Sequence, residues 1–193
     1  MVYTIYETNC IVFDIKNLGE NDCLIKAFSD QFGIISIIAT SFRKTHSKLR
    51  GNIKSFSINQ LSTVKGREFF RLTDTKHIFS FSGSKSLVNF LRFIEDLFWG
   101  DERDYFDIVN KQIYDFIVYL CKFIINIVKS DIENKRDLLN NINILFAVYI
   151  RGLQGFIDKI DIDEILKMND VELIDYIDKN KKILNEKLSK VSI

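Results

Sequence analysis

Two S-x-x-K pairs have the residue types and spacing of a serine nucleophile with a lysine base. Ser41 is followed by Lys44, and Ser62 is followed by Lys65. A lysine amine beside a serine can accept the hydroxyl proton and so activate the oxygen for attack. The chain lacks the S-D-N and K-T-G elements that accompany this motif in serine enzymes. A hydrolase using Ser41 or Ser62 therefore remains a disfavoured alternative, which labelling with an active-serine reagent would reveal.

Other catalytic and metal-binding patterns are absent from the sequence. The chain has no phosphate-binding, dinucleotide-binding or nucleophile-elbow glycine motif. The only histidines, His46 and His77, do not form a metal-binding spacing. A group of acids at 158–164 lacks the glycine of a calcium-binding loop, and we interpret it as helix N-terminal acids that complement the helix dipole. We predict no catalytic residue, no metal and no cofactor, and hence a protein that is not an enzyme.

Basic residues, by contrast, are concentrated in one stretch. The whole chain is nearly neutral, with 27 Lys and Arg against 26 Asp and Glu. Residues 41–71 nevertheless hold eight bases and one acid, Glu68. The bases are Arg43, Lys44, Lys48, Arg50, Lys54, Lys65, Arg67 and Arg71. Such a stretch attracts a polyanion, because neutralising each phosphate releases condensed counterions. We therefore predict that these side chains converge on one wall of their domain and bind DNA there, with His46 donating to phosphate.

Aromatic residues alternate with these bases. Phe32, Phe42, Phe56, Phe69 and Phe70 lie in or beside the basic stretch. Exposed rings next to Lys and Arg allow unpaired bases to stack while the cations follow the backbone. Most of these rings are expected to fill the core, since apolar side chains are usually buried. Phe42, between Ser41 and Arg43 in a polar loop, is the ring for which we predict exposure and contact with DNA.

The rest of the composition describes an ordinary globular protein. The chain has 193 residues, of which 47% are hydrophobic and 27% charged. Three Cys without a C-x-x-C pair argue against disulfides and a zinc finger, and favour buried thiols in a reducing compartment. The N-terminus does not resemble a signal peptide, and the most apolar stretch, 113–128, is interrupted by polar residues. A cytoplasmic location without membrane contact is therefore expected.

The first 80 residues follow the period of strands. Short β-rich runs are separated by turn residues, among them 19–22, 30–33 and Lys65-Gly66-Arg67. The predicted strands are Cys10–Ile15, Cys23–Phe28, Ile34–Ala39, Ser55–Val64 and Phe69–Thr73. Five short strands at this spacing favour a small closed β-barrel, which leaves no exposed sheet edge. We expect a barrel domain over residues 1–80.

Beyond residue 84 the period becomes that of helices. Ser84 or Ser86 is a plausible N-cap for a helix whose apolar face runs from Leu87 to Phe98 and which ends at Gly100. A longer helix from Ile108 to Val128 is apolar nearly all round and is expected at the centre of a bundle. Further helices are predicted over 137–151, 163–167 and 171–188. The fold class is therefore α+β, with a barrel followed by an all-α domain over 81–193.

The order of several N-terminal motifs resembles the start of RecO-type DNA recombination and repair proteins. The likeness covers residues 3–80 and returns weakly at 145–156, where Gly155-Phe156 stands where relatives have a Gly-Tyr pair. The motifs are Ile11-Val12-Phe13, Gly19-Glu20-Asn21-Asp22, Phe32-Gly33-Ile34-Ile35, the basic loop Arg43–Arg50, Phe56, Gly66 and Arg71-Leu72-Thr73.

This resemblance implies an OB-fold followed by a helical domain in a recombination mediator. Such a protein binds single- and double-stranded DNA, anneals complementary strands and associates with RecR and with single-stranded DNA-binding protein. It helps load the recombinase RecA, which implies a location at the nucleoid. No small-molecule substrate is implied.

Two departures from the family pattern stand out. Many relatives carry a four-Cys zinc module after the Gly-Tyr pair, whereas no Cys follows Ile157 here, so we expect no zinc module. Ser55 stands where relatives have a Pro before the equivalent of Phe56. The alternative reading is a non-catalytic interaction scaffold, whose helical half offers an apolar groove to a partner peptide. Peptide binding that persists after the basic loop is neutralised would favour it.

Overall fold

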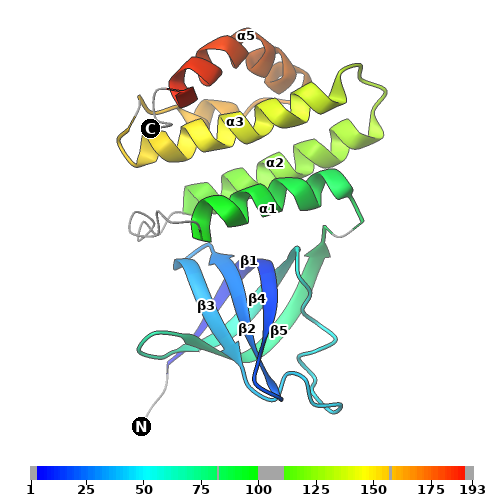
Figure 1. Ribbon diagram of the computed structural model, residues 1–193, viewed down its shortest axis with the longest axis vertical. Helices are drawn as coiled ribbons and strands as arrows, with labels where there is room; N and C mark the ends of the chain where they lie inside the picture. The colour runs from blue at the N-terminus through cyan, green and yellow to red at the C-terminus, as the bar shows by residue number, and fades with distance from the viewer. Residues whose placement is uncertain (1–3, 82, 100–110, 157, 190–193) are drawn as a thin grey trace. The chain divides into compact units, whose positions relative to one another are not determined.

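A computed structural model describes residues 4–81, 83–99, 111–156 and 158–189 (Figure 1). The chain forms two compact units, Met1–Asp115 and Phe116–Ile193. The first contains all five strands, the first helix and the start of the second helix, and the second contains the remaining helical segments.

The first unit is built on a closed five-stranded barrel. Its strands are β1 (Ile5–Leu18), β2 (Asp22–Ser29), β3 (Gly33–Ala39), β4 (Ser57–Lys65) and β5 (Phe70–Ser80). They close in the order β1-β2-β3-β5-β4, with β3 and β5 parallel and the other neighbours antiparallel. Closure by one short parallel contact is the topology of the OB-fold, so the predicted fold class is confirmed.

Two of the strands are longer than their apolar runs. β1 extends beyond Cys10–Ile15 at both ends, and β5 extends past Thr73 to Ser80. The added part of β5 contains Asp74, Lys76 and His77, which the apolar pattern cannot identify as strand. These residues are in the sheet because their backbone pairs with β4 in the register Ser62↔Asp74 to Asn59↔His77. Pairing, rather than side-chain hydrophobicity, sets the length of these strands.

The barrel core is filled by alternate residues of its strands. In β3, buried residues alternate with half-buried ones along Gly33–Ala39. The same alternation places Val12, Ile25 and Leu61 inside. Three cysteines, Cys10, Cys23 and Cys121, are free and buried, as expected.

Helix α1 (Lys85–Trp99) belongs to the barrel unit. Its N-cap is Ser84, whose hydroxyl accepts a hydrogen bond from the Leu87 amide at 3.5 Å. Phe98 of α1 stacks on Phe28 with ring centroids 5.0 Å apart and meets Phe13 edge-on at 6.2 Å. The division at residue 80 stays a prediction: β5 ends at Ser80, and the first compact unit continues to Asp115, with α1 packed on the barrel. Gly100, the predicted end of this helix, lies outside the described residues.

The second unit is helical. Helix α2 (Lys111–Lys129) crosses from the first unit into the second, followed by α3 (Lys135–Leu153), α4 (Ile162–Ile165) and α5 (Asp170–Ser189). Positions 108–110 of the second predicted helix lie outside the described residues. Buried aromatic rings join α2 to α3, where Phe116 meets Tyr149 at 5.0 Å. No described helix is both long and apolar enough to span a bilayer.

Candidate nucleic-acid interface

The basic residues between β3 and β4 lie on an ordered loop, residues 40–56. The loop begins and ends in left-handed backbone conformations, with φ of 54° at Ser41 and 55° at Phe56. Near its start, the Arg43 amide donates to the Asn21 carbonyl at 2.9 Å, and the Ser41 amide donates to the Asp22 carboxylate at 2.7 Å. These bonds tie the loop to the β1–β2 turn.

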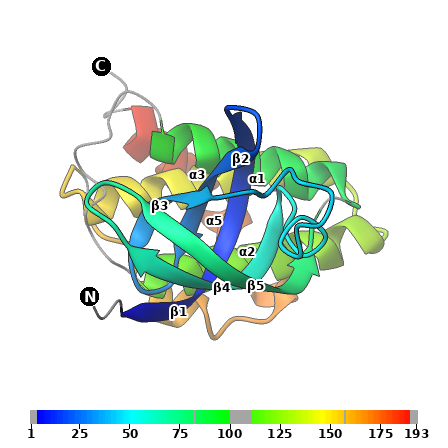
Figure 2. The ribbon, with the colours of Figure 1, turned by 90° about the horizontal axis from the view of Figure 1, so that it is seen from below.

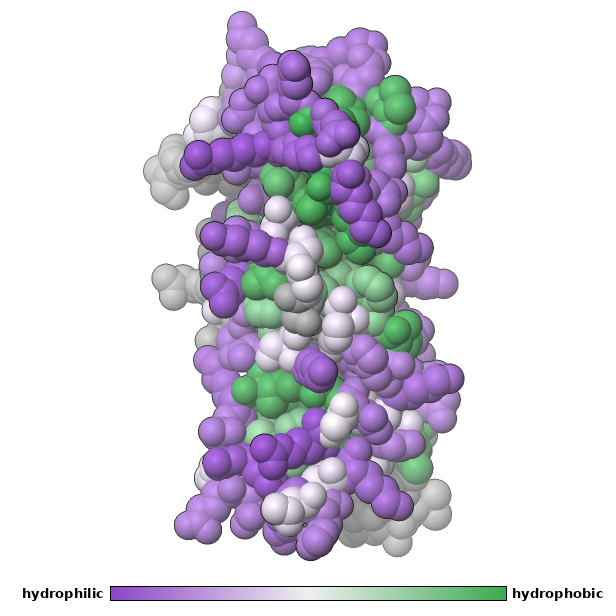
Figure 3. Space-filling model, turned by 90° about the vertical axis from the view of Figure 1, so that its right-hand side faces the viewer, coloured by the Kyte–Doolittle hydropathy of each residue, from purple (hydrophilic) through white to green (hydrophobic). Residues whose placement is uncertain are grey.

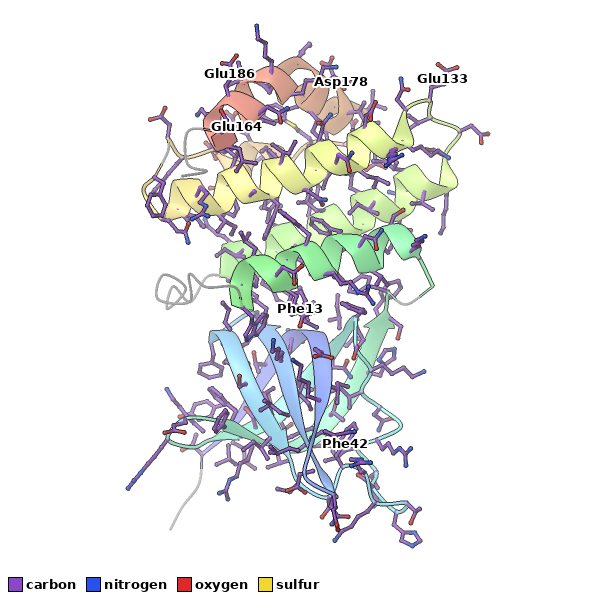
Figure 4. The ribbon with its side chains drawn as sticks, viewed as in Figure 1. Phe13, Phe42, Glu133, Glu164, Asp178 and Glu186 are labelled. Atoms are coloured by element: carbon purple, nitrogen blue, oxygen red, sulfur yellow. The ribbon has the colours of Figure 1, made fainter. Side chains whose placement is uncertain are left out.

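Apolar side chains of the loop point into the barrel. Phe42 is 7% exposed and Ile53 is buried beside it in the barrel core, with Leu49 packed against the same cluster. Phe42 therefore occupies the lower end of the barrel interior (Figure 4). The prediction that Phe42 is exposed and contacts DNA is wrong, because its ring fills the barrel end that the strands leave open. The polar neighbours Ser41 and Arg43, on which the prediction of exposure rested, did not indicate that the Phe42 ring is buried.

A buried polar cluster fixes the C-terminal part of the loop. Asn59 is fully buried and donates to the carbonyl oxygen of Asn52 at 2.6 Å. Ser57, also buried, donates its hydroxyl to the Lys54 carbonyl at 2.6 Å. Because buried donors are costly to leave unpaired, these bonds stabilise one loop conformation.

All nine basic residues named from the sequence are exposed. They are Arg43, Lys44, His46, Lys48, Arg50, Lys54, Lys65, Arg67 and Arg71. Among the described residues, no carboxylate lies within 4.0 Å of any of their charged groups. On the side of the barrel that carries the loop, seen in the lower part of Figure 3, hydrophilic side chains dominate. Their charges are thus not neutralised by a neighbouring carboxylate, although the Arg43 guanidinium also donates to the Gly19 carbonyl at 3.1 Å.

The sequence predicted that these basic residues converge on one wall of the barrel. They do not, and instead form two groups. The first, which we call the loop cations, comprises Arg43, Lys44, Lys48, Arg50 and Lys54, with His46. The second, the hairpin cations, comprises Lys65, Arg67 and Arg71 at the β4–β5 turn. The loop and the turn lie on opposite sides of the barrel in Figures 1 and 2. The reason is that the nine residues of β4 separate them, and a strand rises about 3.3 Å per residue.

The structure adds a basic residue that sequence reasoning missed. Arg92 of α1 is exposed, and its guanidinium lies 5.8 Å from the ring centre of Phe56, at the end of the loop. A cation over an aromatic face is a favourable contact. Arg92 lies beyond the basic stretch in the sequence, and nothing in the helical pattern marked it.

Ser41, Cys23 and His77, which carry groups able to do chemistry, lie in the barrel unit. Ser41 and Lys44 form a turn in which the Lys44 amide donates to the Ser41 carbonyl at 3.2 Å. Burial raises the pKa of the Cys23 thiol, while the charges of Arg43 and Arg50 lower it. His77 is exposed and lies 3.3 Å from the Ser80 hydroxyl. In the described parts of the chain, no three His, Cys, Asp or Glu side chains are placed to hold a metal ion.

A hollow in the second unit bears on the scaffold alternative. It has a volume of about 460 Å³ and lies between α4 and α5. Its lining is mainly charged and polar: Glu164, Lys167, Met168, Glu172, Asp175, Tyr176, Lys179 and Asn180. This is not the apolar groove that the scaffold alternative requires.

Comparison with known proteins matches the first unit. Residues 1–81 match the family model described as Recombination protein O N terminal. The DNA repair protein RecO of Trichodesmium erythraeum is 34% identical over 79 residues, which are 41% of this chain and 27% of that protein. The RecO of Gloeothece citriformis is 33% identical over 78 residues, 40% of this chain and 28% of the relative.

A third relative gives the same extent of similarity. The DNA repair protein RecO of a Synechocystis species is 35% identical over 78 residues, 40% of this chain and 29% of the relative. The matched region therefore spans less than a third of each of these relatives. The matched residues coincide with the barrel, which carries both groups of cations.

Proposed function

Because residues 1–81 form a RecO-type N-terminal domain, we propose that this chain is a non-catalytic DNA-binding mediator of recombination and repair. Its barrel binds the phosphate backbone of DNA through the loop cations. In this proposal it anneals single strands and helps load the recombinase onto strands covered by single-stranded DNA-binding protein. A RecR-type protein is the further partner that the family likeness implies.

The observation that carries the proposal is the ordered presentation of the loop cations. Phe42 and Ile53 anchor the loop in the core, so that its polar residues face solvent. Because the loop is already fixed, little conformational entropy is lost when it binds a ligand. Five exposed cations without carboxylate partners then provide the attraction.

The chemistry of these side chains indicates how binding should behave. Lys and Arg contacts to phosphate position a nucleic acid without reading its sequence. Binding should therefore be weakly sequence-selective and strongly salt-dependent. If five phosphates of a single strand are neutralised, log K should fall against log salt with a slope of roughly −3.5.

The test is a charge-reversal variant in which Arg43, Lys44, Lys48 and Arg50 are all changed to Glu. Fluorescence anisotropy with an unstructured single-stranded oligonucleotide should show binding lost at moderate salt. A matched control changes Lys122, Lys129, Lys181 and Lys182 to Glu, exposed residues whose replacement alters the net charge equally. Circular dichroism should show both variants folded. Unchanged affinity of the loop variant would exclude these residues from the site.

An annealing assay run beside the binding titration tests the finer part of the proposal. Screening of backbone repulsion leaves base edges free to pair, so the loop variant should lose annealing together with binding. Annealing that persists in the loop variant would show that other residues hold the strands.

A further inference from the structure

The turn between β4 and β5 presents an aromatic ring to solvent. Residues 66–69 connect the strands, and the Gly66 amide donates to the Phe69 carbonyl at 3.0 Å. Phe69 is 38% exposed, whereas the adjacent Phe70 is 9% exposed. Phe70, the first residue of β5, belongs to the barrel core, whereas the ring of Phe69, the last residue of the turn, is open to solvent.

The base of this turn is held firmly. The Phe70 ring lies 5.0 Å from that of Phe32, which in turn meets Tyr6 edge-on at 5.3 Å. Phe70 and Arg71 also pair with Ile37 and Ile38 of β3. The ring of Phe69 is therefore carried on an anchored turn, and within the described residues it has no aromatic partner of its own.

The hairpin cations lie within four residues of this ring in the chain. Lys65, Arg67 and Arg71 are exposed, and no carboxylate among the described residues lies within 4.0 Å of their charged groups. Arg71 lies two residues after Phe69, near the start of β5, and both side chains are exposed. An exposed aromatic ring beside cations that have no carboxylate partner matches the chemistry of single-stranded DNA, whose phosphates and bases are both accessible.

We propose that Phe69 stacks on an unpaired nucleobase while the hairpin cations bind the phosphates beside it. This contact is separate from the loop cations and rests on the proposed function. It gives the protein a preference for single strands, because in a duplex each base face is covered by its neighbours in the stack. The loop cations, which bind only phosphate, provide no such preference.

The chain contains a matched control for this ring. Phe79 lies on β5, the strand that follows the turn, and is 44% exposed, similar to Phe69. Its ring, however, meets Phe81 edge-on at 5.2 Å. Phe79 lies near the opposite end of β5 from the hairpin cations. Replacing Phe79 removes an equally exposed ring without touching the proposed stacking site.

The experiment measures the affinity of Phe69→Ala and Phe79→Ala for three ligands of equal length: oligo-dT, the same strand with abasic sites, and a duplex. Phe69→Ala should bind oligo-dT roughly tenfold more weakly, within the range for loss of one stacked base. It should bind the abasic strand and the duplex as the parent does. Phe79→Ala should match the parent on all three. Equal loss on the abasic strand, or no loss on oligo-dT, would overturn the proposal.

A spectroscopic readout tests the stacking directly. In Phe69→Trp, saturating oligo-dT should quench the new fluorescence, and in Phe79→Trp it should not. The two proposals fail differently. If the parent protein binds no DNA, the proposed function is wrong. If the charge-reversed loop weakens binding but Phe69→Ala and Phe69→Trp respond as Phe79 variants do, only the stacking proposal is wrong.

Discussion

The side chain of Asn59 joins the basic loop to the inside of the barrel through the carbonyl oxygen of Asn52, 2.6 Å from its Nδ2. The same Nδ2 donates to the Thr75 hydroxyl at 3.2 Å, and Oδ1, 2.6 Å from the Ser57 hydroxyl oxygen, shares that hydroxyl's single proton with the Lys54 carbonyl. One buried amide thus connects the loop, β4 and β5. The position of the loop cations depends on an interior residue that bears no charge.

Replacement of Asn59 by Ala should therefore loosen the loop. The change leaves buried hydrogen-bonding groups without partners, and we expect the free energy of unfolding to fall by about 3 kcal/mol, the upper end for an unsatisfied buried group. Urea denaturation measures this loss. Trypsin should also cut faster within 43–54, where its Lys and Arg targets lie.

Asn52→Ala is the control for this prediction. Only the backbone carbonyl of Asn52 takes part in the bond to Asn59, and its exposed side chain makes one long hydrogen bond, to the Lys48 carbonyl at 3.4 Å. We expect stability within about 0.5 kcal/mol of the parent. Equal destabilisation by both variants would mean that the Asn59 bond does not hold the loop.

The strand pattern of the sequence predicted the barrel because its strands are short apolar runs between turns. β2 and β3 were placed within a residue or two, since Cys23–Phe28 and Ile34–Ala39 are continuous β-rich runs. The extension of β5 through Asp74 and His77 could not be predicted, because it depends on pairing with β4. Local hydrophobicity records burial and says little about backbone pairing.

The candidate site was predicted in its residue types but not in its spatial arrangement. Charge alone indicates exposure, and all nine basic residues are exposed. Their separation into two groups follows from the direction and length of β4, which sequence distance does not convey. The burial of Phe42 and the exposure of Phe69 have the same cause. A loop ring is buried when the barrel core has space for it, and that space is set by strands that lie far from the ring in the sequence.

A matched pair of glycine substitutions tests the geometry of the β4–β5 turn. A Cβ added at Gly66 would lie 2.6 Å from the Phe69 carbonyl oxygen, so the turn would have to open. At Gly51, in the basic loop, an added Cβ would meet no atom within 4 Å. Gly66→Ala should lower the free energy of unfolding by more than about 1 kcal/mol, whereas Gly51→Ala should be neutral or slightly stabilising. Thermal denaturation of both variants measures this, and equal midpoints would refute the tight turn.

The contact between β2 and α1 should make stability depend on pH. Lys26 Nζ lies 3.7 Å from Glu95 Oε1, and both side chains are mostly buried. Burial raises the pKa of Glu95 above 4.5, the charge of Asp14 adds to this, and Lys26 opposes it.

Because folded Glu95 holds its proton to a higher pH than the unfolded chain does, its contribution to stability is lost as pH rises from 4.5 through the raised pKa. Glu95→Gln cannot lose a proton, so it should gain stability relative to the parent as pH increases from 4 to 7. Urea denaturation at several pH values measures the difference in unfolding free energy between the two proteins. A difference that stays constant, or that shifts in favour of the parent with rising pH, would contradict the assignment of this titration to Glu95.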